Sequence, residues 1–258
     1  MEIYNDLLIQ YNSLSEEEKR AILIYKHILY YHINEISKIE NFENRDAFSL
    51  FDEITDKTKF VNNFEEFKKV INYPQNMIIK LSVFKNIDLS NIYNFIESMK
   101  CVYSILVSAR LKIKLNSDLS VYRGISITDN QNINVVLNSK LISTSIKVDD
   151  ANDFIYQEGY EQSHLFVLSL KEGTNVLVSP LTIVYDYKDA LSMLKNDKKN
   201  ATLKIANRGS FGQQEIILFN DDLIFNELSI DEVDVGEKNK LIVHKIDTEL
   251  VLKKKNHK

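Results

Sequence analysis

The sequence of 258 residues contains one cysteine, two prolines, six glycines and no tryptophan. Because Cys101 stands alone, neither an intrachain disulfide nor a zinc site built from several thiolates can form. The scarcity of proline and glycine, together with 44% apolar residues, excludes collagen-like and disordered chains. No run of about 18 apolar residues is present, so the sequence predicts no membrane span. We expect Cys101 to be a small buried residue within a helix, as free cysteines usually are.

The chain also lacks an excess of positive charge. Its 32 Lys and Arg are outnumbered by 37 Asp and Glu, and the net charge is -5. Proteins that bind nucleic-acid phosphates through charge are usually basic, so nucleic acid is not an expected partner. The first residues resemble no signal peptide. We therefore expect a soluble protein, and secretion or injection into a host cell by a signal-peptide-independent route, an intracellular role and a phage origin fit equally well.

Glycine is unevenly distributed, because all six glycines follow residue 123. A long glycine-free stretch favours helices. Ser15 and Glu18 have the spacing of a capping box at the start of one predicted helix, and a second long helix with a broad apolar face is predicted from Ser90. Shorter helices are predicted at 46–54 and 64–71.

After residue 116 the helical period gives way to short runs typical of strands. These predicted strands are 119–122, 141–145, 165–170, 176–179, 215–219, 223–228 and 241–246. Lys171–Thr174 and Asn220–Asp222 have the composition of turns between neighbouring strands, which favours antiparallel pairing. A helix is predicted at 187–195 within this half. The sequence thus predicts an α+β protein, with a helical N-terminal region at 1–115 and a β-rich domain at 116–258.

Two segments of the β-rich half place polar side chains among strand-forming residues. Arg123 precedes Gly124, which permits the close approach of a ligand or of another backbone. Ser143 and Ser145 share one face of the next predicted strand, and Thr144 takes the other face. Taken singly, the first segment also fits a surface arginine, and the second also fits an edge strand with solvated hydroxyls.

A third segment places Gln213 and Glu215 on one face at the start of an apolar strand, where a carboxylate is costly without a partner. In chain order, Tyr-Arg-Gly, Ser-Thr-Ser and Gln-x-Glu resemble the mono-ADP-ribosyltransferases of the arginine-serine-glutamate class. The resemblance covers residues 119–246, and the combination is more specific than any one segment. It implies two antiparallel sheets that form an NAD cleft. A helical region ahead of such a domain is similar to that of bacterial exoenzymes and toxin catalytic subunits.

The resemblance also implies how the matched residues transfer ADP-ribose from NAD. Glu215 matches the carboxylate that stabilises the oxocarbenium-like transition state. Arg123 matches the arginine that holds the NAD diphosphate, and Ser143 matches the serine that orients the glutamate and NAD. The implied NAD-binding set is completed by the neighbours of these residues, Gly124, Thr144 and Ser145.

Gln213 and Phe211 match the positions that meet the acceptor. In this family, glutamine two residues before the catalytic glutamate accompanies asparagine modification in the Rho-directed exoenzymes, and it carries no charge to pair with a guanidinium. The resemblance therefore implies a protein of a target cell as acceptor, modified on a residue other than arginine, with asparagine favoured. Phe211 fits an exposed aromatic anchor and a core residue equally well.

The chain departs from the family in two places. The residues after Ser145 do not align securely with the loop that contacts nicotinamide in relatives, and Phe154 and Tyr156 are the aromatic candidates for stacking there. The long interval before Glu215 implies an insertion around 179–202. We read the five histidines as structural or solvated, so no metal site is implied, and no glycine-rich phosphate loop of a βαβ unit is present.

The sequence leaves three functional readings open. The first is an NAD-dependent mono-ADP-ribosyltransferase that serves as a bacterial effector or toxin. An NAD glycohydrolase on the same scaffold would pass ADP-ribose to water instead of a protein. A non-enzymatic binding module would keep the same strands for structural reasons only.

Overall fold

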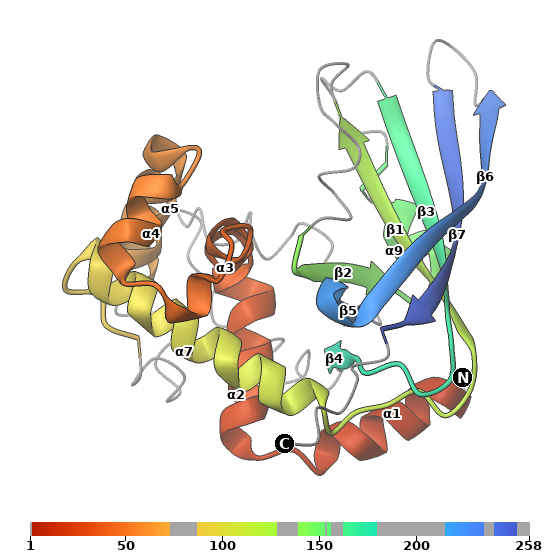
Figure 1. The fold of residues 1–258 in the computed structure, drawn as a ribbon, viewed down its shortest axis with the longest axis horizontal. Coiled ribbons are helices and arrows are strands. Elements are labelled where there is room, and N and C mark those ends of the chain that lie inside the picture. Colours follow the sequence, from red (N-terminus) through yellow and green to blue (C-terminus); the bar gives the residue numbers. More distant parts are fainter. Residues whose placement is uncertain are drawn as a thin grey trace, which may run out of the picture. The chain divides into compact units, whose positions relative to one another are not determined.

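The computed structural model describes residues 2–72, 87–127, 139–152, 154–155, 162–179, 215–234 and 240–251. Over these residues the chain is α+β, as predicted, with most helices ahead of the strands (Figure 1). It divides into two compact units. The first comprises Met1–Ser13, Arg110–Val178 and Gln213–Lys258, and the second comprises Leu14–Ala109 and Ser179–Gly212. The grouping of the first 13 residues with the strands was not anticipated, and the boundary near residue 116 stays a prediction.

Within its described residues, the helical unit contains the helices predicted from the sequence. Ser15 caps the first of them, because its hydroxyl accepts from the Glu18 N–H at 3.2 Å while Glu18 Oε2 accepts from the Ser15 N–H at 2.9 Å. The elements are α2 (Glu16–Ile24), the π-helical turn η1 (Tyr25–Leu29), α3 (Tyr30–Ser37), the 3-10 turn η2 (Phe42–Asn44), α4 (Ala47–Glu53), α5 (Lys57–Asn72) and α7 (Ile92–Arg110).

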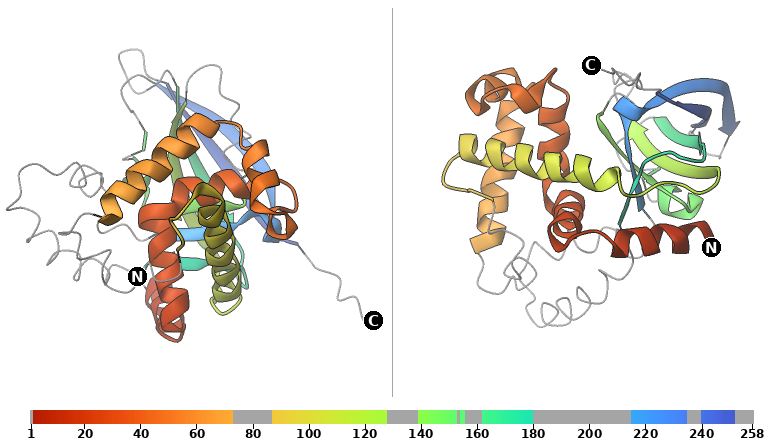
Figure 2. Two further views of the ribbon diagram at one scale, coloured as in Figure 1. Left: turned by 90° about the vertical axis from the view of Figure 1, so that its left-hand side faces the viewer. Right: turned by 60° about the horizontal axis from the view of Figure 1, so that its bottom comes forward.

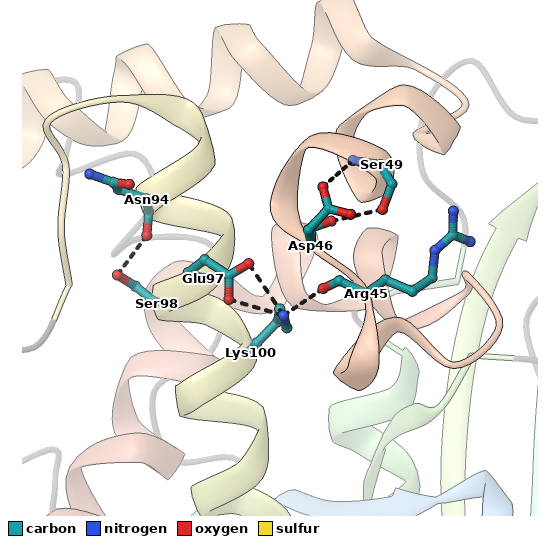
Figure 3. Close-up of polar contacts among 7 residues, drawn as sticks. All are labelled: Arg45, Asp46, Ser49, Asn94, Glu97, Ser98 and Lys100. Carbon is teal, nitrogen blue, oxygen red and sulfur yellow. Dashed lines mark hydrogen bonds and ion pairs between the residues drawn. The ribbon is translucent and has the colours of Figure 1, made fainter.

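A polar contact joins α7 to the segment just before α4 (Figure 3). Asp46 caps α4 by accepting from the Ser49 N–H at 3.0 Å. Lys100 of α7 donates to the Arg45 carbonyl at 2.6 Å and to Glu97 at 2.9 Å. The lysine therefore connects the segment just before α4 to the middle of α7.

Cys101 lies in α7 but is exposed, so the prediction of a buried cysteine was wrong. The buried face of α7 includes Met99, Val102 and Leu106, which recur at helical spacing. Cys101 falls on the opposite side of the helix. The average tendency of free cysteine to be buried is therefore overridden by the position of this one.

His32, on α3, is buried among aromatic rings. The rings of Phe60 and Phe95 meet it edge-on, with centroids 4.8 and 5.0 Å away. Burial lowers the pKa of His32 to about 4 and outweighs the opposing effect of the Phe60 backbone. His32 is thus a structural histidine, as expected, held neutral within an apolar core.

The sheet unit confirms every predicted strand, and several extend further than predicted. Its strands lie in the order β4-β5-β2-β1-β3-β7-β6, and Figures 1 and 2 show β7 and β6, in blue, side by side at one edge. The elements are α1 (Glu2–Asn12), β1 (Leu119–Ile127), β2 (Leu141–Ser145), α9 (Val148–Asn152), β3 (Gln162–Leu170), β4 (Leu177–Ser179), β5 (Glu215–Phe219), the 3-10 turn η3 (Asn220–Asp222), β6 (Leu223–Asp234) and β7 (Lys240–Leu250).

The sheet differs from the two antiparallel sheets that we expected. The described strands form one seven-stranded sheet, and β3 and β7 run parallel. Two groups of strands are still recognisable, because β1 meets β2 through the single pair Tyr122 and Ser145, whereas β1 and β3 pair along nine residues. One narrow junction thus joins β4-β5-β2 to β1-β3-β7-β6.

The two predicted turns are present, but the strands that they connect are not neighbours in the sheet. Gly173 adopts a φ of +86° in the turn after β3, and η3 follows β5. Yet β4 pairs beside β5 rather than β3, and β6 pairs with β7 rather than β5. Turn composition shows where the chain changes direction and does not show which strand it joins next.

Helix α1 is held to the segment that leads into β1. The Gln10 side chain donates to the Lys114 carbonyl at 2.9 Å and accepts from the Lys114 N–H at 2.8 Å. Asp6 accepts a hydrogen bond from Asn116. These contacts explain why the first residues group with the sheet. Of the described helices, none has the length and apolar character needed to cross a membrane.

A chain of polar side chains links the parallel strands β3 and β7 to β6. His164 Nδ1 lies 3.0 Å from His244 Nε2, and His244 Nδ1 lies 2.7 Å from Glu227 Oε1. Since the carboxylate can only accept, His244 Nδ1 donates to Glu227. Burial and the neighbouring His244 lower the pKa of His164 to about 4. Both histidines are structural and buried rather than solvated.

Candidate active site

The structure brings Arg123, Ser143 and Glu215 onto three neighbouring strands. Arg123 lies on β1, Ser143 on β2 and Glu215 on β5, and the sheet order places β2 between the other two (Figure 1). The apolar residues that follow Glu215 are fully buried, which fixes β5 in the sheet. The three segments singled out from the sequence are therefore adjacent in space.

Ser143 contacts Glu215 directly. The Ser143 hydroxyl donates to Glu215 Oε1, although the residue opposite Glu215 in the strand register is Ser145. Residues two apart on one strand and residues directly opposite one another share a face, so all three side chains lie on the same side of the sheet. Glu215 is only 7% exposed. The buried carboxylate thus has the polar partner that the sequence argument required.

Arg123 is anchored to the same strand. Its Nη1 donates to the Ser143 carbonyl at 2.7 Å, and the side chain is half-buried. Within the part of the chain that the structure describes, no carboxylate pairs with this guanidinium. A guanidinium has five N–H donors, so most of them are available for an anion.

Thr144 and Ser145 fix the strand between these residues. The Thr144 hydroxyl donates to the Ile216 carbonyl of β5 at 2.8 Å, which fastens β2 to β5 on the face opposite Ser143. The Ser145 hydroxyl donates to Asp150 Oδ2 at 2.6 Å and accepts from the Lys147 N–H at 3.2 Å. Both hydroxyls tie β2 to neighbouring segments, and their role in NAD binding stays a prediction.

Sequence reasoning missed Asp150 on α9. A serine at the end of a strand with an acidic residue a few positions later is a local pattern that side-chain hydrogen bonds commonly use. The pattern is frequent enough in proteins that it carries little information without the structure. Here it places a second carboxylate, that of Asp150, within hydrogen-bond distance of Ser145, the residue opposite Glu215 in the strand register.

Gly124 is needed for the close approach of a backbone. A Cβ atom at this position would lie 1.9 Å from the Ala151 carbonyl oxygen and 2.8 Å from an Ile155 side-chain carbon. Helix α9 therefore lies directly against β1, where Ala151, Ile155 and Leu165 form a small apolar cluster. The close approach predicted from the sequence is to protein, and contact with NAD at Gly124 stays a prediction.

Several predicted site residues lie outside the described residues: Phe211, Gln213, Tyr156, the helix at 187–195 and the insertion after Ser179. Phe154 is described and is 43% exposed, and its carbonyl accepts from the Ser126 hydroxyl at 3.1 Å. No group of three His, Cys, Asp or Glu side chains suited to a metal ion occurs in the part of the chain that the structure covers.

The arrangement combines one cationic and one anionic group on the two strands that flank β2. The guanidinium offers free N–H donors to an anion such as a phosphate. The carboxylate, oriented by a hydroxyl and largely shielded from water, can stabilise positive charge that develops nearby. A substrate that carries phosphate and develops positive charge as it reacts would complement both groups.

Comparisons with known proteins give structural similarities only. No family model matches the chain, and no curated protein matches it. Among solved structures, the ADP-ribosylating toxin BECa of a binary enterotoxin of C. perfringens, crystallised with NADH, is 12% identical with a TM-score of 0.46, over 95% of this chain and 45% of that one. The Clostridium limosum C3 exoenzyme is 12% identical with a TM-score of 0.44, over 94% and 90% of the two chains.

The enzymatic component C2-I of the C2 toxin from Clostridium botulinum is 15% identical with a TM-score of 0.42, over 98% of this chain and 46% of that one. The chain therefore spans less than half of the BECa and C2-I chains. The structures found belong to the same class of protein as the resemblance drawn from the motifs. At these identities and TM-scores, the similarities by themselves assign no activity, substrate or partner to the chain.

Proposed function

We propose that the protein is an NAD-dependent mono-ADP-ribosyltransferase in which Glu215, Ser143 and Arg123 act on NAD. One observation carries the proposal: Ser143 donates its hydroxyl hydrogen bond to the buried Glu215, while its carbonyl accepts from Arg123. A single residue thus orients both the anionic and the cationic group. The three motifs that suggested this activity meet at that residue.

The proposed chemistry begins with cleavage of the bond between nicotinamide and ribose in NAD. Both electrons of that bond leave with nicotinamide, which departs neutral, and positive charge develops on the ribose. Glu215 accepts a hydrogen bond from a ribose hydroxyl and faces this charge, so it stabilises the transition state more than bound NAD. Ser143 contributes by fixing the carboxylate orientation before the reaction begins.

Arg123 is proposed to hold the NAD diphosphate. Its permanent charge and forked donors suit a phosphate pair better than a lysine would. Because Nη1 is fixed to the Ser143 carbonyl, the guanidinium is pre-ordered and loses less side-chain entropy when it binds an anion.

The acceptor assignment is proposed on the sequence motif alone. Gln213 would receive the acceptor and Phe211 would contact it, which favours an asparagine-type side chain on a protein of a target cell. The protein would then be a bacterial effector or toxin. Because the matched toxin chains BECa and C2-I are more than twice as long as this chain, whole-protein activity and delivery are also part of the proposal.

The test is nicotinamide release from NAD, with and without eukaryotic cell lysate. We expect release that increases with lysate, and we expect Glu215→Gln to lower it by about 100-fold or more, since one group aimed at the transition-state charge contributes on that scale. Glu172→Gln is the matched control, because Glu172 is exposed in the turn after β3. Full turnover in Glu215→Gln would refute the role of Glu215.

The same assay separates the other readings. Release that is Glu215-dependent but indifferent to lysate would favour the glycohydrolase, in which water accepts ADP-ribose. NAD at millimolar concentration should also raise the melting temperature of the wild type. A wild type that neither binds nor cleaves NAD would be a binding module instead.

A further inference from the structure

The Ser145 hydroxyl is hydrogen-bonded to α9. Its one proton is donated to Asp150 Oδ2 at 2.6 Å, and its oxygen accepts from the Lys147 N–H at 3.2 Å. Ser145 is nevertheless the residue directly opposite Glu215 in the register of β2 and β5. Directly opposite side chains have Cβ atoms about 5 Å apart, which is within reach of a serine hydroxyl and a glutamate carboxylate.

We propose that Asp150 is a positioning residue that holds the Ser145 proton away from the Glu215 carboxylate. The inference rests on the proposed function, because it concerns how well Glu215 acts on NAD. Ser143 already donates to one oxygen of that carboxylate. If Ser145 turned and donated as well, the carboxylate charge would be further neutralised before NAD binds. Glu215 would then be a weaker acceptor for the ribose hydroxyl and would stabilise developing positive charge less.

The position of Asp150 is fixed by the packing of α9. The next residue, Ala151, is 2% exposed, and its carbonyl oxygen lies 1.9 Å from the position that a Cβ of Gly124 would take. Asp150 can therefore not follow a moving side chain without displacing the short helix. A carboxylate held in this way fixes the orientation of the Ser145 hydroxyl before substrate binds, so binding requires no further reorganisation of that hydroxyl.

The kinetic test compares two substitutions at the same position. Asp150→Ala removes the acceptor and the charge, whereas Asp150→Asn keeps an acceptor oxygen and removes only the charge. We expect Asp150→Ala to lower kcat for nicotinamide release about tenfold, the scale of one hydrogen bond, with KM for NAD changed less than about twofold. Asp150→Asn should retain most of kcat. Asp149→Ala, on the exposed side of α9, is the control and should match the wild type.

A double-substitution cycle shows whether Asp150 acts through Ser145. In a Ser145→Ala background no hydroxyl is left to release, so the effect of Asp150→Ala on kcat should shrink to less than about twofold. A purely structural role would instead give losses of kcat that multiply in the double variant, accompanied by a lower melting temperature. Multiplying losses, or equal losses in Asp150→Asn and Asp150→Ala, would overturn the inference.

A crystal structure of the full-length Asp150→Ala variant tests the inference without any activity. We expect Ser145 Oγ to rotate until it lies within about 3 Å of a Glu215 carboxylate oxygen. A Ser145 side chain that keeps its wild-type orientation would overturn the inference, whether or not NAD is cleaved. Absence of nicotinamide release by the wild type would instead refute the proposed function, so the two failures are distinguishable.

Discussion

A methyl group added at Gly124 should damage the protein more than its size suggests. Gly124→Ala would place a Cβ 1.9 Å from the Ala151 carbonyl oxygen, and ordinary van der Waals contact begins near 3.4 Å. The difference, about 1.5 Å, must be absorbed by moving backbone, because a carbonyl oxygen within a helix cannot rotate away as a side chain can. Overpacking of this kind costs about 1–3 kcal/mol, and we expect the upper end, about 3 kcal/mol.

The same displacement should reach the proposed site. The hydrogen bond from Ser145 to Asp150 is 2.6 Å long, so it can lengthen by only about 0.9 Å before it exceeds the 3.5 Å limit of a hydrogen bond. A movement of α9 by about 1.5 Å away from β1 is larger than that. Gly124→Ala should therefore lower nicotinamide release as well as stability, even if Gly124 never touches NAD.

The measurement is urea unfolding followed by circular dichroism, with Gly173→Ala as the control. Gly173 has no atom closer than 3.8 Å to an added Cβ, but its φ of +86° makes alanine unfavourable by about 1–2 kcal/mol. The two glycines thus separate steric exclusion from backbone strain. If Gly124→Ala unfolds at the wild-type urea concentration, the close contact between β1 and α9 is wrong. A cost no greater than that of Gly173→Ala would show that α9 yields easily.

Two further predictions concern stability. His32 has its pKa lowered to about 4 by burial, whereas the unfolded chain binds this proton near pH 6.5, so the contribution is complete above about 6.5 and is lost on acidification. The free energy of unfolding should fall by about 3 kcal/mol for this residue between pH 6.5 and 4, and urea titrations of His32→Leu should show a correspondingly shallower loss; an unchanged loss would contradict this. Arg110 Nη1 lies 2.7 Å from Asp222, with its guanidinium 4.4 Å from the centre of the Phe219 ring, and both charges are buried. Arg110→Met should cost about 3 kcal/mol in thermal unfolding by removing the cationic partner of the buried Asp222 carboxylate, and Asp222→Asn in that background should restore part of it; no recovery would contradict a charge effect.

The strands and their polar residues could be predicted because each motif is embedded in a strong local pattern. Residues 141–145 and 215–219 alternate or run together as apolar stretches with clear ends, and the structure gives these two strands the predicted bounds. The two-residue period placed Ser143 and Ser145 on one face, and the contact between Ser143 and Glu215 was implied by the family resemblance. The local sequence pattern was sufficient to predict a strand wherever the patterned run of residues had the same length as the strand.

Sheet order could not be predicted for a physical reason. Pairing between β3 and β7 joins Ser163 to Leu241, and between β2 and β5 it joins Ser145 to Glu215, so both depend on contacts between distant parts of the chain. The turn residues after β3 and β5 indicate a change of direction, and hairpins are the commonest outcome. Here the next strand is an edge strand of the sheet both times, and the turn residues do not indicate this.

Helix α9 shows how a site can depend on an element that carries almost no signal. With five residues, Val148–Asn152, it is too short to display a helical period, yet it contacts two of the three motifs. Ala151 occupies the space that Gly124 leaves open beside Arg123, and Asp150 holds the hydroxyl of Ser145 opposite Glu215. The glycine of the first motif and the last serine of the second therefore meet the same short helix. Since the backbone contact sets where α9 lies and the carboxylate acts only at short range, the geometry around Glu215 depends on the absence of a side chain at Gly124.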